Sequence, residues 1–434
     1  MTTTETLSIH QPEDVLGYIP HLLGYWPEDS LVAITLQGNL FGATLRVDLP
    51  TTDSPVGRAA FAEYVRTHLL ADGQANGVVF ALYNDEGWED GSVVLRAMPL
   101  LSALKAALGP VGLPIREAWL VGSRYWRSAF CDNPECCPVP GLPVEQIRNS
   151  RINAEMVYRG STVGSPPGST EDPPVLALNG ACDAQILEAE SRFAEQLREA
   201  WRSELCFDAV LGAWQRVLNH AGPDSQRPTD RVPGPFEGPA GKDRAGFLRA
   251  ALTVPAWRDA VMVMAAGGFA TAKAGARAFN LFSDDVSRAL PFDLFELGLG
   301  PVEPEKVAPC PGDGPTAGGN ESTVAVFSYG EVLLGLQPAV PDWQMLEALR
   351  RTLVSLCFDG EQSEAAASAL TVQGWISWCK GNGSLADVCL GRALAARPGY
   401  RLAELLEGIL GQGTISSWAR RQESAWGTYA AAHE

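Results

Sequence analysis

Three cysteines, Cys131, Cys136 and Cys137, lie within seven residues of one another and are the residues here best suited to chemistry. Thiolates bind soft metals, attack electrophiles and exchange disulfides. A closed structural zinc site needs four ligands, and two adjacent cysteines usually point apart. The three thiols therefore suggest a metal site without completing one.

The sequence leaves the fourth ligand open. Asp132, Glu135, Cys182 or a distant histidine could supply it, and zinc is the cofactor that such a set would bind. The interpretation that we favour from sequence alone is a tight loop whose small sulfur side chains pack inward.

Two further hypotheses apply to the same thiols. A disulfide from Cys131 to either neighbouring cysteine would close easily across the turn at Pro134, although a reducing compartment would keep it open. A nucleophilic cysteine would need a base, and only folding could bring His21 or His68 close.

A candidate pocket is expected upstream of the cysteines. Trp26, Glu28 and Asp29 combine an aromatic ring with two carboxylates between an expected helix and strand, and Arg124 stands in an aromatic segment further along. These four residues could line a pocket mouth. The alternative is a structural turn, with the aromatic rings covering a sheet edge.

Composition excludes several classes of protein. The 434 residues carry 33 basic and 51 acidic side chains, a net charge of −18, which disfavours nucleic acid and anionic membranes as partners. The most apolar run, residues 261–272, is shorter than a membrane span of about 20 residues. With six of its nine cysteines scattered singly and no apolar leader, the sequence predicts a cytoplasmic protein with reduced thiols.

The first 135 residues alternate between strand and helix patterns. Apolar runs at 31–36, 40–47, 77–83 and 115–122 are typical of strands, and residues 12–23, 58–70 and 98–108 have helical spacing. The expected fold class is α/β, with an N-terminal mixed sheet and flanking helices, followed by a mostly α-helical C-terminal region.

This pattern divides the chain into three parts. Residues 1–140 form an α/β head ending in the cysteine loop, 141–182 a loop-rich connection, and 183–434 a mostly helical region. Breaks rich in proline and glycine are expected near 222–241 and 301–320. In the last part, Gly381 should stop one helix, and Ser384 with Asp387 should cap the next.

Several segments together resemble one family. They are the run from Pro12 to Val32, the block Arg46–Pro50, the block from Arg124 through Cys131, Cys136 and Cys137 to Gly141, and the stretch from Trp378 to Leu406. They are similar to the actinobacterial family described as domain of unknown function 4192. The resemblance implies a bacterial cytosolic protein and supplies no catalytic residue.

Two functional hypotheses remain. Phosphate-binding, zinc-protease and serine-hydrolase motifs are absent from the sequence, so a non-enzymatic module that binds a protein partner or associates with itself is favoured. It predicts an exposed apolar groove on the C-terminal helices. The alternative is an enzyme, or a small-molecule or redox sensor, with a site near the cysteine loop.

Overall fold

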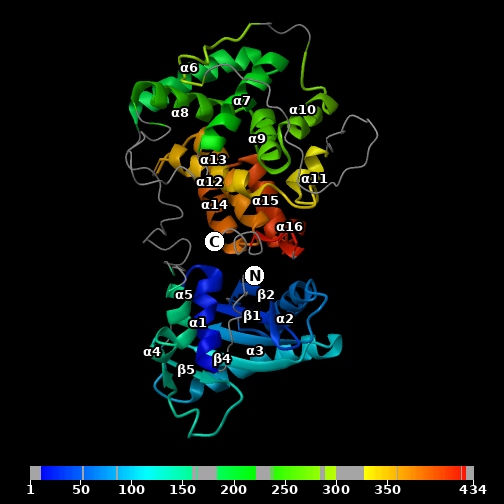
Figure 1. Cartoon of the computed structure of the whole chain (residues 1–434). Helices are drawn as coiled ribbons and strands as arrows, with labels where there is room; N and C mark the ends of the chain where they lie inside the picture. The colour runs from blue at the N-terminus through cyan, green and yellow to red at the C-terminus, as the bar shows by residue number, and fades with distance from the viewer. Residues whose placement is uncertain are drawn as a thin grey trace, which may run out of the picture. The chain divides into compact units, whose positions relative to one another are not determined.

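The computed structural model describes residues 11–50, 53–84, 87–158, 163, 183–220, 236, 238–283, 289–299, 327–358, 360–421 and 423–426. The chain forms two compact units, Met1–Leu176 and Ala177–Glu434, which are described separately (Figure 1). The expected break at 301–320 lies wholly outside the described residues, and that at 222–241 mostly so. Cys182 and Cys310 also lie outside them.

The first unit is built on one mixed sheet of six strands, in the order β2-β1-β3-β4-β5-β6. Only β3 and β4 are parallel neighbours, and the other neighbouring pairs are antiparallel. The strands are β1 (Ser30–Gln37), β2 (Leu40–Asp48), β3 (Gly77–Tyr83), β4 (Ile115–Val121), β5 (Tyr125–Ser128) and β6 (Leu142–Pro143). The mixed sheet expected from the sequence is confirmed.

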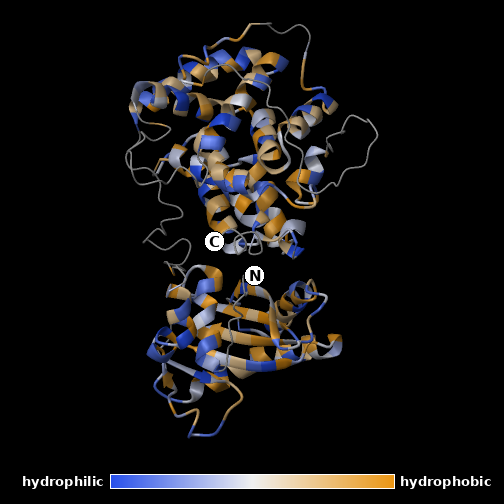
Figure 2. Ribbon diagram, viewed as in Figure 1, coloured by the Kyte–Doolittle hydropathy of each residue, from blue (hydrophilic) through white to orange (hydrophobic). Residues whose placement is uncertain are grey.

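The central strands are apolar because both faces of the sheet are covered. Along β1, Leu31 and Ala33 belong to one buried cluster, and Val32 and Ile34 to the cluster on the opposite face. Strand β3 is buried at every residue. The strands accordingly stand out as apolar in Figure 2.

Helices lie on both faces. On one face, Leu16 of α1 (Pro12–Leu23) and Ile147 of α4 (Glu145–Arg148) share a core with Trp119 of β4. Helix α5 (Arg151–Tyr158) packs on α1. On the other face lie α2 (Pro55–Leu69) and α3 (Ser92–Leu108), and a 3₁₀ turn (Gly109–Val111) follows α3.

One helical stretch among the described residues, Ser92–Val111, has the length and composition that could cross a membrane. In this unit Leu100, Leu101, Leu104 and Leu108 of that stretch are buried in the core beneath the sheet. These apolar side chains therefore pack against the sheet.

The second unit is helical over most of its described residues (Figure 1). Its centre is α13, which is buried at every position from Ala365 to Cys379. The helices are α6 (Ala184–Ala200), α7 (Glu204–His220), α8 (Gly238–Leu252), α9 (Pro255–Gly267), α10 (Phe269–Ala278), α11 (Tyr329–Leu333), α12 (Trp343–Leu356), α13 (Glu364–Cys379), α14 (Gly383–Ala396), α15 (Arg401–Gly411) and α16 (Ser417–Arg420).

The hairpin of α13 and α14 shows one success and one error of local sequence reasoning. Gly381 ends the first helix with a left-handed φ of +83°, as expected. The expected cap, Ser384, is wrong: Asn382 is the N-cap, and its side chain accepts a hydrogen bond from the N–H of Leu385. Asparagine and serine are equally good N-caps. Asn382 takes the position because it directly follows Gly381, where the preceding helix ends.

Candidate metal centre

The three cysteine sulfurs come together in the loop that leaves β5. The Sγ atoms of Cys131, Cys136 and Cys137 all lie within 4.8 Å of one another. Those of Cys131 and Cys136 are 3.3 Å apart. Cys136 and Cys137 are adjacent in sequence, and the expectation that their side chains point apart is wrong, because their sulfurs also lie within 4.8 Å of each other.

A tight turn brings the sulfurs together. The N–H of Cys137 donates to the carbonyl of Asn133 at 2.8 Å, and the N–H of Glu135 donates to Oδ1 of Asn133 at 3.0 Å. Beyond the turn, the indole N–H of Trp88 donates to the carbonyl of Pro140 at 2.9 Å. These bonds define the shape of the loop.

The three thiols differ in exposure and in acidity. Cys136 is exposed, Cys131 is half-buried and Cys137 is buried. The backbone N–H of Asn133 and the other two thiol groups hydrogen-bond to the sulfur of Cys131 and lower its pKa. The bond to Cys131 raises the pKa of Cys136, and burial raises the pKa of Cys137 to about 11. Cys131 is thus the thiol that ionises first.

The sulfur positions are those of free thiols, and they are also compatible with a shared ion. A disulfide requires an S–S distance of about 2.05 Å. Two sulfurs bonded to one tetrahedral zinc at about 2.3 Å each lie about 3.8 Å apart. The 3.3 Å between Cys131 and Cys136, and the 4.8 Å limit for the whole group, bracket that value.

Within the described part of the chain, no carboxylate or imidazole joins the three thiols. Asp132 and Glu135 are exposed, and both belong to the same loop. The ring of His21 contacts Asn153, and that of His68 contacts the carbonyl of Tyr64. The nucleophile hypothesis therefore finds no base among these residues, and the set offers three ligands with a fourth position open.

A buried cation stands beside the loop. Arg127 of β5 is only 5% exposed, and its Nη2 donates to the carbonyl of Cys131 at 3.4 Å. Its Nε is buried without a hydrogen-bond partner, and no ion pair of Arg127 occurs among the described residues. A buried guanidinium is stabilised by a nearby anion, which thiolates would supply.

The four residues expected to line a pocket do not all meet. Trp26 and Glu28 line a cavity of about 160 Å³. Arg124 instead pairs with Glu89 at 2.5 Å on the surface, and Asp29 shapes a turn with a φ of +37°. Neither of these two residues lines the cavity, and none of the three cysteines does.

Sequence reasoning missed the remaining walls of this cavity. Tyr83 and Asn84 at the end of β3 and Arg148 of α4 lie against it. In the sequence, Tyr83 is the last residue of the apolar run 77–83, and Arg148 belongs to the expected loop-rich connection 141–182. The signal that would have found them is the parallel pairing of β3 with β4, because ligands bind at the carboxyl ends of parallel strands.

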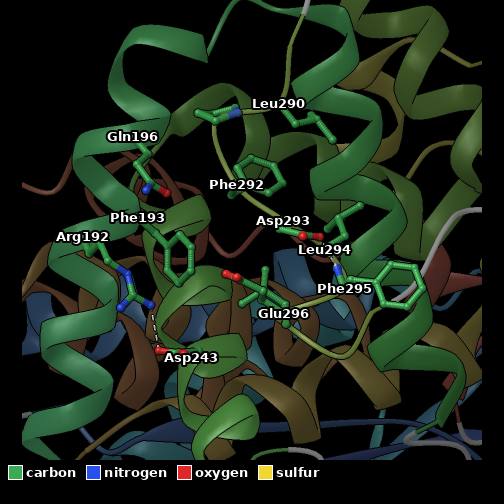
Figure 3. Close-up of a pocket in the computed structure, with 12 residues that line it drawn as sticks. Arg192, Phe193, Gln196, Asp243, Leu290, Phe292, Asp293, Leu294, Phe295 and Glu296 are labelled. Carbon is green, nitrogen blue, oxygen red and sulfur yellow. Dashed lines mark hydrogen bonds and ion pairs between the residues drawn. The ribbon is translucent and has the colours of Figure 1, made fainter.

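A larger cavity, of about 760 Å³, lies in the helical unit between α6, α8 and residues 290–297 (Figure 3). Arg192 and Asp243 on its wall already pair with each other at 2.8 Å. The ring of Phe295 at its edge is 72% exposed, so the cavity is open to solvent. Size alone would favour it, but neither a cysteine nor a histidine lines it, and we place the candidate site at the thiols.

Comparisons with known proteins address the identity of the chain. No curated protein and no solved structure matches it. A family model described as domain of unknown function (DUF4192) matches residues 12–291 and 337–415. The match contains the sheet, the cysteine loop and the α13–α14 hairpin, and it extends over residues 220–291, where no resemblance was recognised. The chain therefore belongs to the family of the domain of unknown function DUF4192.

Proposed function

We propose that the α/β unit is a zinc-binding module that holds one ion through the thiolates of Cys131, Cys136 and Cys137. The observation that carries this proposal is the convergence of the three Sγ atoms within 4.8 Å. Thiolates select soft or borderline metals, among which zinc accepts a tetrahedral set without redox chemistry.

Little movement is needed to bind the ion. The Cys131–Cys136 distance has to widen by about 0.5 Å to reach the spacing of two zinc-bound sulfurs. Cys136 is exposed and its side chain can rotate, whereas Cys137 is anchored by its buried side chain and its backbone hydrogen bond. The loop is therefore largely organised for the metal in advance.

Charge supports the same assignment. Zinc with three thiolates carries one net negative charge. The guanidinium of Arg127, buried and bonded to the carbonyl of Cys131, would offset it. The open fourth position would hold water or an incoming ligand, as in zinc sites that exchange a ligand.

The location of the protein is part of this proposal. All seven cysteines in the described residues are free thiols. Free thiols and thiolate-bound zinc are both compatible with a reducing bacterial cytoplasm. The low lysine content, five residues against a larger number of arginines, fits the actinobacterial source that the family resemblance implies.

The protein-binding hypothesis stays a prediction. It requires an exposed apolar groove on the C-terminal helices. Helix α13 cannot form one, because its apolar side chains are buried in the core. Leu405 of α15 is 47% exposed, with Leu402 and Ile409 only partly buried beside it on the same helix. A single exposed leucine of this kind is common on protein surfaces and identifies no partner.

Alanine variants of the three cysteines test the proposal. Each variant and the unaltered full chain would be titrated with zinc against a chromophoric chelator under reducing conditions. We expect the unaltered chain to bind one zinc per chain, and each variant to lose at least about tenfold in affinity. Cys206→Ala is the matched control, because Cys206 is a free thiol buried in the core of the helical unit, and this variant should bind zinc normally.

Two results would overturn the proposal. One is equal zinc affinity in the Cys131→Ala and Cys136→Ala variants and in the unaltered chain, with all three folded by circular dichroism. The other is a chain that binds no zinc when reduced and loses two thiols reversibly on treatment with peroxide. That second result would assign the pair a redox role instead.

A further inference from the structure

A row of residues with unpartnered polar atoms crosses the sheet of the first unit. Ser30 of β1 pairs with Tyr83 of β3, Tyr83 with Val121 of β4, and Val121 with Trp126 of β5. These four side chains point to the same face of the sheet, and three of them end in a polar atom. The row lies at the carboxyl ends of the parallel strands β3 and β4.

The polar atoms of this row are buried and have no hydrogen-bond partner in the described residues. They are Oγ of Ser30, the hydroxyl of Tyr83 and Nε1 of Trp126, and Oδ1 of Asn84 joins them at the next position of the chain. Ser30, Tyr83 and Trp126 are at most 3% exposed. A buried polar group that stays without a hydrogen-bond partner destabilises the folded chain. Because these unsatisfied atoms lie close together, we infer that a bound molecule supplies their hydrogen bonds.

A cavity adjoins the row. It has a volume of about 160 Å³, and Tyr83 and Asn84 form part of its wall. The rings of Trp26 and Tyr83 are T-shaped to each other, with a centroid distance of 6.2 Å and an interplanar angle of 88°. At about 30 Å³ per molecule, the cavity has room for about five waters or one small organic molecule.

Charges of opposite sign flank this cavity. Glu28 and Arg148 both line it, and both residues are exposed. The guanidinium of Arg148 lies over the ring of Trp26, 5.2 Å from its centroid. Among the described residues neither side chain forms an ion pair, and each keeps its charge available to a ligand.

We propose that this cavity binds a small free α-amino acid. The ligand carboxylate would pair with Arg148, its ammonium group with Glu28 and Oδ1 of Asn84, and the hydroxyl of Tyr83 would complete the polar contacts. A zwitterion is the class of ligand that satisfies a cation, an anion and an unpartnered acceptor at the same time. The volume restricts the ligand to amino acids with small side chains.

This site is separate from the thiols. The register places Trp126 at the carboxyl end of β4 and Ser128 two residues further back, opposite Trp119. Strand β5 therefore runs away from the cavity before it reaches Cys131. Zinc binding and amino-acid binding can consequently succeed or fail independently.

The probes are the common free amino acids, with acetate and methylamine as half-ligands that each carry one of the two charges. Binding to the full chain would be measured by calorimetry, and the melting temperature by thermal unfolding. We expect at least one small amino acid to bind and to raise the melting temperature, and neither half-ligand to do so at the same concentration.

Two variants and a control sharpen the test. Tyr83→Phe removes only the buried hydroxyl, and Arg148→Gln removes the cation, so each should weaken amino-acid binding at least tenfold. Without ligand, Tyr83→Phe should be as stable as the unaltered chain or more stable, because it deletes an unsatisfied group. Arg124→Gln is the control: Arg124 is exposed, lies near the end of β4 and does not line the cavity, so this variant should bind normally.

Two outcomes would overturn the inference. In one, none of the amino acids binds, and a loss of stability in the free Tyr83→Phe variant would then assign the hydroxyl to ordered water. In the other, an amino acid binds with unchanged affinity to both Tyr83→Phe and Arg148→Gln, which would place its site elsewhere.

Discussion

The Sγ atoms of Cys131 and Cys136 lie 3.3 Å apart, across a turn closed by the hydrogen bond from Cys137 to Asn133. That separation is too long for a disulfide and close to the spacing of two ligands on one zinc ion. Because Cys137 lies within 4.8 Å of both, the loop presents three sulfurs to one point.

Arg127 should tune the proposed zinc site without touching the metal. Its guanidinium holds the carbonyl of Cys131 and brings a buried positive charge to the loop. We expect Arg127→Gln to raise the zinc dissociation constant about ten- to a hundredfold, as the loss of supporting contacts does at other metal sites. Arg127→Lys, which keeps the charge, should recover part of the loss in the same titration. Equal affinities in all three proteins would contradict this role.

A buried ionic cluster should matter far more for stability than an exposed pair between the same two helices. Arg249 of α8 is 1% exposed and pairs with Glu190 of α6 at 2.6 Å and with Glu361. Arg249→Ala leaves two carboxylates without their cation and should cost about 3–5 kcal/mol of unfolding free energy.

The matched control for this cluster is Arg192→Ala, because Arg192 of α6 pairs with Asp243 of α8 at the surface. It should cost less than about 1 kcal/mol. Urea unfolding, with hydrogen exchange followed at α6 and α8, measures both variants. Similar costs for the two would contradict the assignment of the buried cluster as a stabilising centre.

Glu347 of α12 should make stability depend on acid. Burial acts to raise its pKa, but hydrogen bonds from Arg350 and the charge of Lys380 outweigh burial and hold the pKa at about 2. A carboxylate whose pKa is lowered on folding contributes stability above its unfolded pKa of about 4.5, and that contribution is lost as pH falls towards 2. Burial lowers the pKa of Lys380, yet with two cations beside it the carboxylate stays charged.

The corresponding variant is Glu347→Gln. It should be less stable than the unaltered chain by about 3 kcal/mol at neutral pH, and the difference should shrink as pH falls below about 4.5. Glu364→Gln, which removes an exposed pair with Arg397 at 3.7 Å, should change little at any pH. Chemical denaturation over this range measures both, and a pH-independent deficit for Glu347→Gln would contradict the charge-based account.

Local sequence patterns predicted most of the strands, but they placed some helix boundaries wrongly. The apolar runs of β1 and β3 were recognisable because they are buried on both faces. Helix α3 was expected from Met98, but it begins at Ser92 and runs through Pro99. Its early turns are held by contacts with the sheet, which outweigh the local preference of proline for a helix start.

The candidate sites depended on long-range pairing that no local pattern contains. The cysteines could be identified, but their convergence follows from backbone bonds at Asn133. Ser30 and Trp126 are 96 residues apart in sequence, yet they lie in one row across the sheet because β1, β3, β4 and β5 pair in one particular register. Only that register shows that their polar atoms lie on the same face of the sheet and at the same end of it.

The zinc content of the purified chain tests the central claim most directly. Protein prepared without chelator would be analysed for zinc per chain, and its free thiols counted after unfolding in the presence of a chelator. The account predicts one zinc per chain and nine free thiols, with the zinc lost when Cys131 is replaced by alanine. A chain that carries no zinc, takes up none when the metal is added and still shows nine free thiols would contradict it.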